Sequence, residues 1–310
     1  MIRDLKLKDG PRVFEFLKNY FPEEERYLGT RPEGVERVLR RVFRWDIRFL
    51  LGMARLFGRP AFRFFVVEED GKIVATTLLS FPERAGYVST VSVDASYRRR
   101  GLARSLLERA RVATLATGRK YIALEVLADN TPARALYESI GYRPLRESHL
   151  LVRENGGPAP VAASPAIRPF RREDARAVVA IANRLQPSEV HEVLPVRESA
   201  VRGSGFIERV LETETAAWVV DRGHGPEGYL SASTSRLTEA GNLSDPILAE
   251  TVPATDAAAL VSGAVAWSQA HGSKRVVTNV PVANVRGRAA LLEGGFHEAI
   301  VLWTLYRTAA

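Results

Sequence analysis

One segment of the sequence combines the residue types needed to hold a phosphorylated ligand. Three consecutive arginines, Arg98, Arg99 and Arg100, precede Gly101, and Ala103 follows two residues later. The pattern predicts that a strand ends before this basic loop and that a helix begins at the glycine. The free N–H groups at a helix N-terminus favour a pyrophosphate, and small residues let phosphate oxygens approach the backbone. The segment predicts an anion site, and an ordinary basic loop before a helix is the alternative.

The loop resembles the cofactor motif of the GCN5-related N-acetyltransferase (GNAT) superfamily. That motif reads Arg/Gln-x-x-Gly-x-Gly/Ala after a strand, and Arg98-x-x-Gly101-x-Ala103 fits it. A second signature of the superfamily follows in the same order and spacing, namely Leu124-Glu125-Val126, Asn130, Ala133, Ala135-Leu136-Tyr137 and Gly141-Tyr142. The resemblance covers residues 2–153, and weaker echoes extend over residues 166–307.

The resemblance implies acetyl-CoA, or another acyl-CoA, as the cosubstrate. Its pyrophosphate would lie on the Arg98–Ala103 loop, which includes Leu102. The pantetheine arm would pair with the backbone of Val91 and Val93 along a splayed strand, and an amide near Val91 would bind the thioester carbonyl and its developing oxyanion. Asn130 would contact the pantetheine or cap the following helix.

Acyl transfer to an amine needs a base that deprotonates the ammonium and benefits from an acid that protonates the leaving thiolate. The resemblance places the acid at Tyr137, which is protonated at neutral pH because an unperturbed tyrosine has a pKa of ~10. It places the base at Glu125, acting directly or through water. The alternatives are an aromatic residue packed on the sheet and a solvated strand glutamate. His149 is a third candidate, as a base or a substrate ligand, although a lone histidine is more often structural.

The elements that must position these residues alternate between strands and helices. The first half predicts helices at Pro11–Tyr20, within 31–57, at 101–117 and at Thr131–Ile140, and strands at Phe62–Glu69, Lys72–Phe81, Ala85–Asp94, Tyr121–Leu127 and Tyr142–Arg153. Antiparallel hairpins followed by strand–helix–strand units predict an α/β (mixed α+β) fold. Its sheet would be mixed, mostly antiparallel and flanked by helices.

The second half repeats the first. Ile2-Arg3 followed by Asp9 matches Ile167-Arg168 followed by Asp174. The Gly- and Pro-rich stretch between the halves is typical of a linker. The sequence therefore predicts tandem folds: a cofactor-binding, catalytically competent domain at 1–153, a linker at 154–165, and a diverged domain at 166–310.

The second copy has lost the residues that carry the chemistry. Val252, Thr255 and Ala257 fall at the positions of the arginine, glycine and alanine of the cofactor motif. Asn279 falls at the position of the expected base, and Leu291 at that of the expected acid. We expect a non-catalytic second domain that packs against the first and helps to build the acceptor pocket.

The composition is that of a globular chain without thiol chemistry. Of 310 residues, 46% are hydrophobic and 26% are charged. The absence of Cys excludes disulfides, thiolate metal ligands and a cysteine nucleophile, and the five scattered His suggest no metal site. The longest apolar run, Ala257–Trp267, is shorter than the ~18 residues that a membrane helix needs. With no signal peptide at the start, we expect a cytoplasmic protein without a membrane partner.

Positive charge is concentrated in the first half. Residues 1–155 hold 29 Lys and Arg against 20 Asp and Glu, whereas residues 156–310 hold 15 against 16. A nucleic acid would also suit a basic half, but the sequence contains no recognised nucleic-acid-binding module, so we expect no such partner. Five arginines at helical spacing suggest a solvated helix face or a lid for an acidic substrate: Arg37, Arg40, Arg41, Arg44 and Arg48.

The sequence thus predicts an acyl-CoA-dependent N-acyltransferase, with acetyl-CoA as the expected donor. Because there is no Cys to carry the acyl group, we expect direct attack by a primary amine in a ternary complex. The alternative is a non-catalytic acetyl-CoA-binding sensor or assembly subunit. The amine acceptor, a small molecule or a protein N-terminus, and the oligomeric state stay open.

Overall fold

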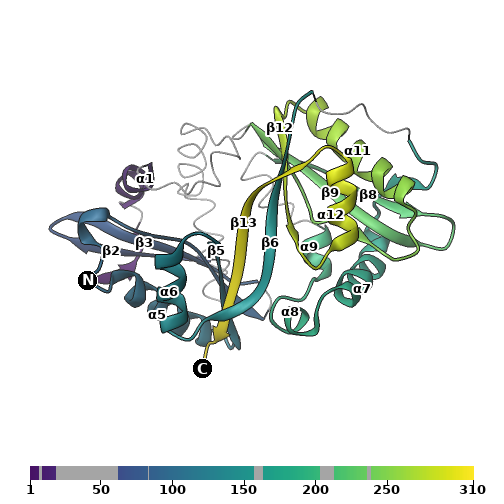
Figure 1. Ribbon diagram of the computed structural model, residues 1–310. Helices are drawn as coiled ribbons and strands as arrows, with labels where there is room; N and C mark the ends of the chain where they lie inside the picture. The colour runs from purple at the N-terminus through teal and green to yellow at the C-terminus, as the bar shows by residue number, and fades with distance from the viewer. Residues whose placement is uncertain (7–8, 19–61, 83, 157–162, 203–212, 236–238) are drawn as a thin grey trace.

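The computed structural model describes residues 1–6, 9–18, 62–82, 84–156, 163–202, 213–235 and 239–310. The strands of this part of the chain form one 13-stranded mixed sheet with helices on its faces (Figure 1). The predicted fold class is confirmed. The helices expected within 31–57, with their five arginines, lie outside the described residues. Among the described helices, none is long and apolar enough to cross a membrane.

The described part of the first half contains the elements that the sequence predicts for it, and one short additional strand. Its strands are β1 (Ile2–Asp4), β2 (Phe62–Glu69), β3 (Lys72–Ser80), β4 (Ala85–Val93), β5 (Tyr121–Leu127) and β6 (Arg143–Glu154). Its helices are α1 (Gly10–Lys18), α5 (Leu102–Leu115) and α6 (Thr131–Ser139). The turn between β2 and β3 contains Asp70 and Gly71, both with positive φ, as a tight hairpin requires.

The second half repeats this order with shorter additional elements. Its strands are β7 (Ile167–Pro169), β8 (Thr213–Asp221), β9 (Pro226–Ser235), β10 (Ala240–Leu243), β11 (Ile247–Leu248), β12 (Arg275–Pro281) and β13 (His297–Thr308). Its helices are α7 (Ala175–Leu185), α8 (Ser188–Val193), α9 (Glu198–Arg202), α11 (Ala254–Ala270) and α12 (Val285–Glu293). The sequence did not predict β7, β10, β11, α8 and α9, because such short elements show too little periodicity.

The last strand of each half lies in the sheet of the other half. β13 pairs antiparallel with both β5 and β6, and β6 in turn pairs with β12. Figure 1 shows β6 and β13 running side by side through the middle of the molecule. The division at residue 153 marks the sequence repeat, but it does not separate two independent sheets. A strand of the second half completes the sheet that carries the predicted site.

The core residues confirm this exchange. Leu305 of β13 is buried in the apolar cluster beneath α5 and α6, and Leu151 of β6 is buried in the cluster beneath α11 and α12. Both clusters lie on the same face of the sheet, because the paired residues of β13 and β6 project to a common side.

The residues that reveal the repeat form the same buried ion pair in each half. The Nη2 atom of Arg3 donates to Oδ1 of Asp9 over 2.9 Å, and Nη2 of Arg168 donates to Oδ1 of Asp174 over 2.9 Å. These hydrogen bonds lower the pKa of both carboxyls. The pair ties the first strand of each half to the start of its first helix.

Candidate active site

The basic loop has the backbone that the anion-site prediction requires. Asp94 caps a short 3₁₀ turn by accepting from the amide of Ser96 over 2.8 Å. Arg99 and Gly101 then adopt positive φ values of 64° and 77°. Helix α5 starts without a side-chain cap, so Gly101 presents the uncapped first turn of the helix at an exposed position.

The three arginines of the loop are exposed around this helix start. The Nε atom of Arg98 donates to the carbonyl of Val93 over 3.3 Å, and Nη2 of Arg100 donates to that of Ser96 over 3.2 Å. The Arg100 guanidinium lies 4.8 Å from the centroid of the Tyr97 ring. Each hydrogen bond uses one donor, and Nη1 of Arg100 also lies 3.9 Å from Oε2 of Glu69. The exposed arginines still place positive charge in front of the helix.

Strands β4 and β5 separate where the pantetheine arm was predicted to lie. They pair in parallel only from Ala85–Val88 to Tyr121–Leu124. Beyond this point, among the described strands, β4 pairs only with β3, and β5 pairs only with β13. The pairing of β4 with β3 is also interrupted by a bulge at Thr90, whose φ is 56°. The predicted separation of β4 and β5 is therefore present. The bulge next to Val91 changes the direction of the β4 backbone where it borders the gap.

Glu125 lies on β5 just past the point of separation. It is directly opposite Thr304 of β13, whose hydroxyl donates to the Glu125 carboxylate over 3.5 Å. The Nε atom of Arg146, on β6, donates to the same hydroxyl over 3.3 Å. A row of polar side chains therefore crosses three strands, and its middle member comes from the second half.

Tyr137 lies on the opposite face of β5 from Glu125. It packs in the core cluster with Ile122 and Leu124, whereas the register places Glu125 on the face of Ala123. Burial raises the pKa of Tyr137 to about 12. No described residue forms a hydrogen bond with its hydroxyl. Glu125 and Tyr137, predicted as base and acid, therefore lie on opposite faces of the sheet and do not contact each other.

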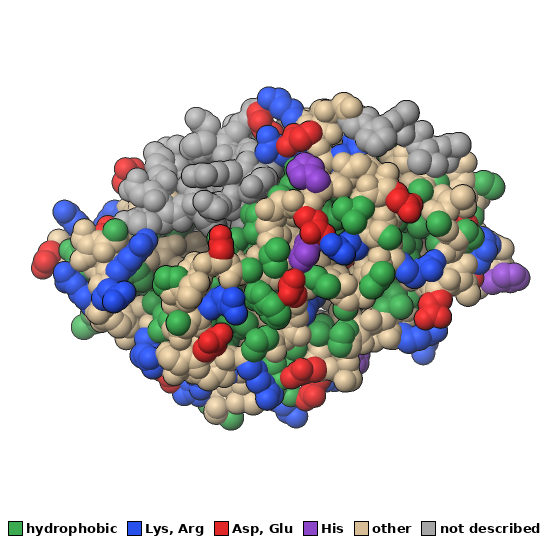
Figure 2. All heavy atoms as spheres, in the orientation of Figure 1, with side chains coloured by type: hydrophobic (Ala, Val, Ile, Leu, Met, Phe, Trp, Pro, Cys, Tyr) green, Lys and Arg blue, Asp and Glu red, His purple; other side chains and the backbone are tan. Residues whose placement is uncertain are grey.

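Asn130 and His149 have local partners. The side chain of Asn130 caps α6 by accepting from the amide of Ala133 over 3.2 Å, so its helix-capping role is confirmed. His149 lies between Glu147 at 3.1 Å and Glu298 at 2.9 Å. Its place in β6 puts it on the face away from the Glu125 side chain. Figure 2 shows acidic, basic and histidine side chains mixed over the middle of that face.

The comparisons with known proteins agree with this geometry. The family model described as acetyltransferase (GNAT) matches residues 14–142. A solved tandem GNAT protein from the clavulanic acid biosynthesis pathway covers 100% of this chain, and 98% of that protein is covered, with a TM-score of 0.64 and 18% identity. Residues 14–142 therefore form a GNAT domain, and the whole chain has the fold of a tandem GNAT protein. The repeated sequence predicts this tandem arrangement.

Other relatives match parts of this GNAT chain or its fold. The N-alpha-acetyltransferase 40 of Saccharomyces cerevisiae is 34% identical over 123 residues, which cover 37% of this chain and 39% of that protein. The mycothiol acetyltransferase of Beutenbergia cavernae is 38% identical over 77 residues, or 24% and 26% of the two chains. A GNAT structure from Sphaerobacter thermophilus has a TM-score of 0.66 at 16% identity and covers 100% and 95%. The matches therefore span less than half of the curated relatives.

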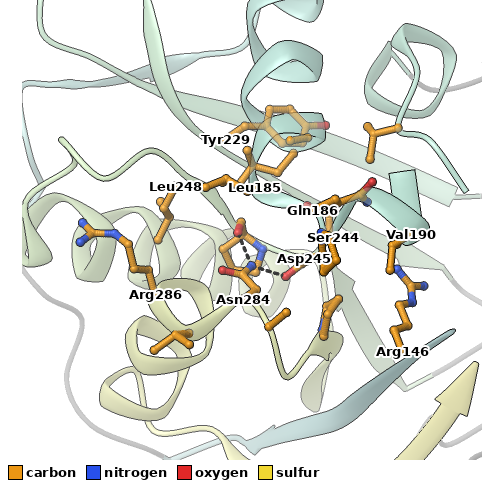
Figure 3. A pocket seen from close by; sticks show the side chains of 18 of the residues that line it. Arg146, Leu185, Gln186, Val190, Tyr229, Ser244, Asp245, Leu248, Asn284 and Arg286 are labelled. Atoms are coloured by element: carbon orange, nitrogen blue, oxygen red, sulfur yellow. Dashed lines mark hydrogen bonds between the residues drawn. The ribbon is translucent and has the colours of Figure 1, made fainter. Parts of the chain in front are cut away.

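In the second repeat, side-chain hydrogen bonds span the strand gap. Asn284 takes the place of Asn130 and also caps its helix, α12. Its Nδ2 atom additionally donates to Oδ1 of Asp245 over 2.6 Å and to the carbonyl of Pro246 over 2.7 Å. Figure 3 shows Asp245 and Asn284 joined in this way at the centre of a pocket. No equivalent bonds join Asn130 to β4 among the described residues.

The counterparts of the cofactor loop in the second repeat include no arginine and no glycine. Val252 is buried, Pro253 is the N-cap residue of α11, and Asp256 lies in the first turn of this helix. Leu291, at the position of Tyr137, is fully buried in the core. A carboxylate at the helix start opposes a bound phosphate, because both are negatively charged.

The sequence did not predict Thr304, Arg146 or Asp245. Thr304 and Arg146 meet Glu125 only because the last strands are exchanged, and Asp245 lies in a weakly patterned segment between two very short strands. The sequence also predicts a final strand at His297–Tyr306, and the place of Thr304 in that strand is the one available signal.

Proposed function

We propose that this protein is an acetyl-CoA-dependent N-acetyltransferase whose active site lies in the first repeat. The observation that carries the proposal is the exposed Arg98–Ala103 loop, which leads from a bulged, separated strand into an uncapped helix. The GNAT family uses acetyl-CoA, and this arrangement fits its pyrophosphate and its extended pantetheine arm. Acetyl-CoA supplies the acetyl group as an activated thioester.

The first repeat would hold the donor through backbone groups and arginines. The amides of Gly101, Leu102 and Ala103 point out of the first turn of α5 and would bind the diphosphate, with Arg98, Arg99 and Arg100 neutralising its charge. The backbone of Val91 and Val93 would pair with the pantetheine arm. The amide at Val91, beside the bulge, would stabilise negative charge that develops on the thioester oxygen.

Glu125 and Tyr137 would move the two protons of the reaction. Glu125 takes a proton from the ammonium of the acceptor, directly or through water, which frees the lone pair of the nitrogen. The nitrogen forms a bond to the thioester carbon and loses its second proton to solvent. The C–S bond then breaks as Tyr137 gives its hydroxyl proton to the leaving thiolate, and solvent returns a proton to Tyr137. The raised pKa of Tyr137 keeps it protonated throughout the neutral range. Asn130 positions the start of α6 and thereby Tyr137.

The second repeat would act through structure rather than by turnover. Its cofactor-loop counterpart carries Asp256, and the hydrogen bonds of Asn284 cross its strand gap. It supplies β13, and with it Thr304, to the first repeat. The acceptor would be a primary amine. The curated relatives act, by their names, on protein N-termini and in mycothiol chemistry, and both a peptide and a small amine remain within the proposal.

Two measurements test the proposal separately. Isothermal titration of acetyl-CoA into the full chain should show one site, and Arg98→Gln with Arg99→Gln should weaken binding by at least about 10-fold. Arg109→Gln, an exposed arginine farther along α5, is the matched control and should bind acetyl-CoA normally.

Thiol release with a library of amines and peptides then tests turnover. A signal that requires both acetyl-CoA and an amine supports the transferase. Tight acetyl-CoA binding with no thiol release from any amine would instead identify the non-catalytic acetyl-CoA-binding subunit. Absence of acetyl-CoA binding would contradict both functions.

A further inference from the structure

The second repeat contains a cavity of about 470 Å³, a volume typical of small-molecule sites. Its walls come from α7, α8, the β10–β11 segment and the start of α12, and Arg146 of the first repeat closes one end. Most of the lining is apolar, including Leu185, Val190 and Leu248. The cavity thus offers an apolar body with a few polar groups at defined places.

Asp245 is the acidic group at the centre of this cavity. Its Oδ1 atom accepts from Asn284, and no described cation lies within ion-pair distance of its carboxyl. Burial raises the pKa of Asp245 to about 7, although the hydrogen bond from Asn284 and the charge of Arg146 both lower it. A ligand cation beside this carboxyl would relieve the cost of burying it.

Two further polar groups face the same part of the cavity. Oε1 of Gln186 is buried and has no hydrogen-bond partner, which leaves an acceptor for an N–H donor. Arg146 uses Nε for Thr304, and its guanidinium forms no ion pair with a described carboxylate. Figure 3 shows Arg146 and Gln186 on one side of Asp245, and Arg286 on the other.

The remaining charged groups of the lining have other partners or lie at the rim. Glu147 contacts His149 on the opposite face of the sheet. Arg286 donates to the carbonyl of Val252. Glu250 is exposed. The Asp245 carboxyl and the Arg146 guanidinium therefore both line the apolar cavity without forming an ion pair with each other.

We infer that this cavity binds a zwitterionic amino acid with an apolar side chain. The ammonium group pairs with the Asp245 carboxylate and donates to Gln186, the carboxylate pairs with the Arg146 guanidinium, and the side chain lies against Leu185, Val190 and Leu248. An acyl-CoA does not suit this cavity, because Asn284 ties β10–β11 to α12 across the gap. The inference does not depend on the proposed acetyl transfer.

The site is connected to the first repeat by one hydroxyl. Arg146 donates to Thr304, and Thr304 donates to Glu125. A carboxylate bound to Arg146 would therefore be linked through Thr304 to Glu125, the proposed base. The amino acid is either the acceptor itself or a separate ligand, and the two cases differ in whether it becomes acetylated.

Titration calorimetry with L-leucine tests the inference on the full chain without acetyl-CoA, near neutral pH. Leucine should bind, whereas 4-methylpentanoate, which lacks the ammonium, and 3-methylbutylamine, which lacks the carboxylate, should each bind at least about 10-fold more weakly. Mass spectrometry after incubation with acetyl-CoA shows whether the leucine becomes acetylated. N-acetylleucine makes it the acceptor, and unmodified leucine makes it a separate ligand; both results support the site.

Matched variants show which side chains bind the leucine. Arg146→Gln and Asp245→Asn should each weaken leucine binding at least about 10-fold, and Arg286→Gln, in the same cavity, should leave it within about 2-fold. Circular dichroism spectra and cooperative thermal unfolding should be retained in all three variants, which shows that they are folded. No heat from leucine up to about 10 mM, equal binding of the two truncated compounds, or an Arg286→Gln loss as large as that of Arg146→Gln would overturn the inference.

Discussion

Thr304, on the last strand of the second repeat, lies directly opposite Glu125 of the first and donates a hydrogen bond to its carboxylate. The proposed base is therefore held by a residue that is 179 positions away in the sequence. Because Thr304 is fully buried and also accepts from Arg146, its hydroxyl has two fixed partners. The exchanged strand thus contributes a positioning residue as well as a strand.

Replacing the Thr304 hydroxyl should slow the reaction without affecting donor binding. Thr304→Val keeps the shape but leaves Glu125 and the Nε atom of Arg146 without their shared partner, so we expect kcat to fall roughly 3- to 10-fold. Thr304→Ser should restore most of the activity. Steady-state kinetics and acetyl-CoA titration measure the two effects, and unchanged kcat in the valine variant would exclude this positioning role.

Removing the Tyr137 hydroxyl should affect turnover more than stability. Tyr137→Phe keeps the packing against Tyr142, whose ring centroid is 6.0 Å away, so its melting temperature should change little. We expect kcat to fall roughly 10²-fold, because no acid then meets the thiolate. Since the pKa of Tyr137 is about 12, the wild-type rate should show no alkaline loss from this group below about pH 11. Wild-type turnover by Tyr137→Phe would remove its proposed role.

Tyr142→Phe is the matched control on the same helix–strand connection. The Tyr142 hydroxyl is buried and has no hydrogen-bond partner among the described residues. Its removal should leave kcat unchanged and make the protein equally stable or more stable by about 1 kcal/mol. Chemical denaturation and the kinetic assay measure both properties.

Glu125→Gln should remove the base and keep the fold. The amide still accepts from Thr304, but it takes no proton from the acceptor, so kcat should fall about 10²-fold or more and the acid limb of the pH–rate profile should flatten. Glu138→Gln, an exposed change on α6, is the control. An acid limb that persists in Glu125→Gln would place the base elsewhere.

Asp245→Asn should stabilise the protein, and more so at higher pH. The pKa of Asp245 is raised from 3.8 to about 7, so the native state carries the full cost of a buried charge only above that pH. Below about pH 4 the group is protonated in both the native and unfolded states, and the cost disappears. The gain in unfolding free energy, at most about 4 kcal/mol, should grow between about pH 4 and pH 7 and stay constant above that range in urea titrations. The exposed Asp129→Asn should show no such trend.

Deleting residues 297–310 should disable both repeats at once. The truncated chain would lack β13, which leaves β5 and β6 without their shared neighbour and removes Leu305 from the first core. We expect aggregation and loss of cooperative unfolding, because two strand edges become exposed. Removal of Ala310 alone is the control. A monomeric truncated protein that still binds acetyl-CoA would contradict the exchange.

Local signals were sufficient to predict most elements near the candidate site. Phe62–Glu69 and Tyr121–Leu127 have the predicted bounds, because turns and β-branched or aromatic residues delimit them. The helix after the basic loop begins within one residue of its predicted start, because Gly101 marks the position. The roles assigned to Tyr137 and Glu125 stay predictions.

The strand exchange was not predictable from local pattern. Residues 142–153 and 297–306 have the same alternation whether each strand closes its own half or the other one, since periodicity identifies a strand but not its neighbour. Thr304 therefore could not be assigned to the site, and neither could Arg146. Asp245 was missed because its partner, Asn284, is 39 residues away.

The crossed last strands also affect how this chain tolerates change over time. Neither copy is a removable module, since each keeps the other's edge covered. We expect the second copy to accept substitutions around Val252 and Leu291, whereas substitutions along His297–Thr308 would also disturb the sheet of the first copy. The rate of amino-acid substitution should therefore be lowest in the two exchanged strands, β6 and β13.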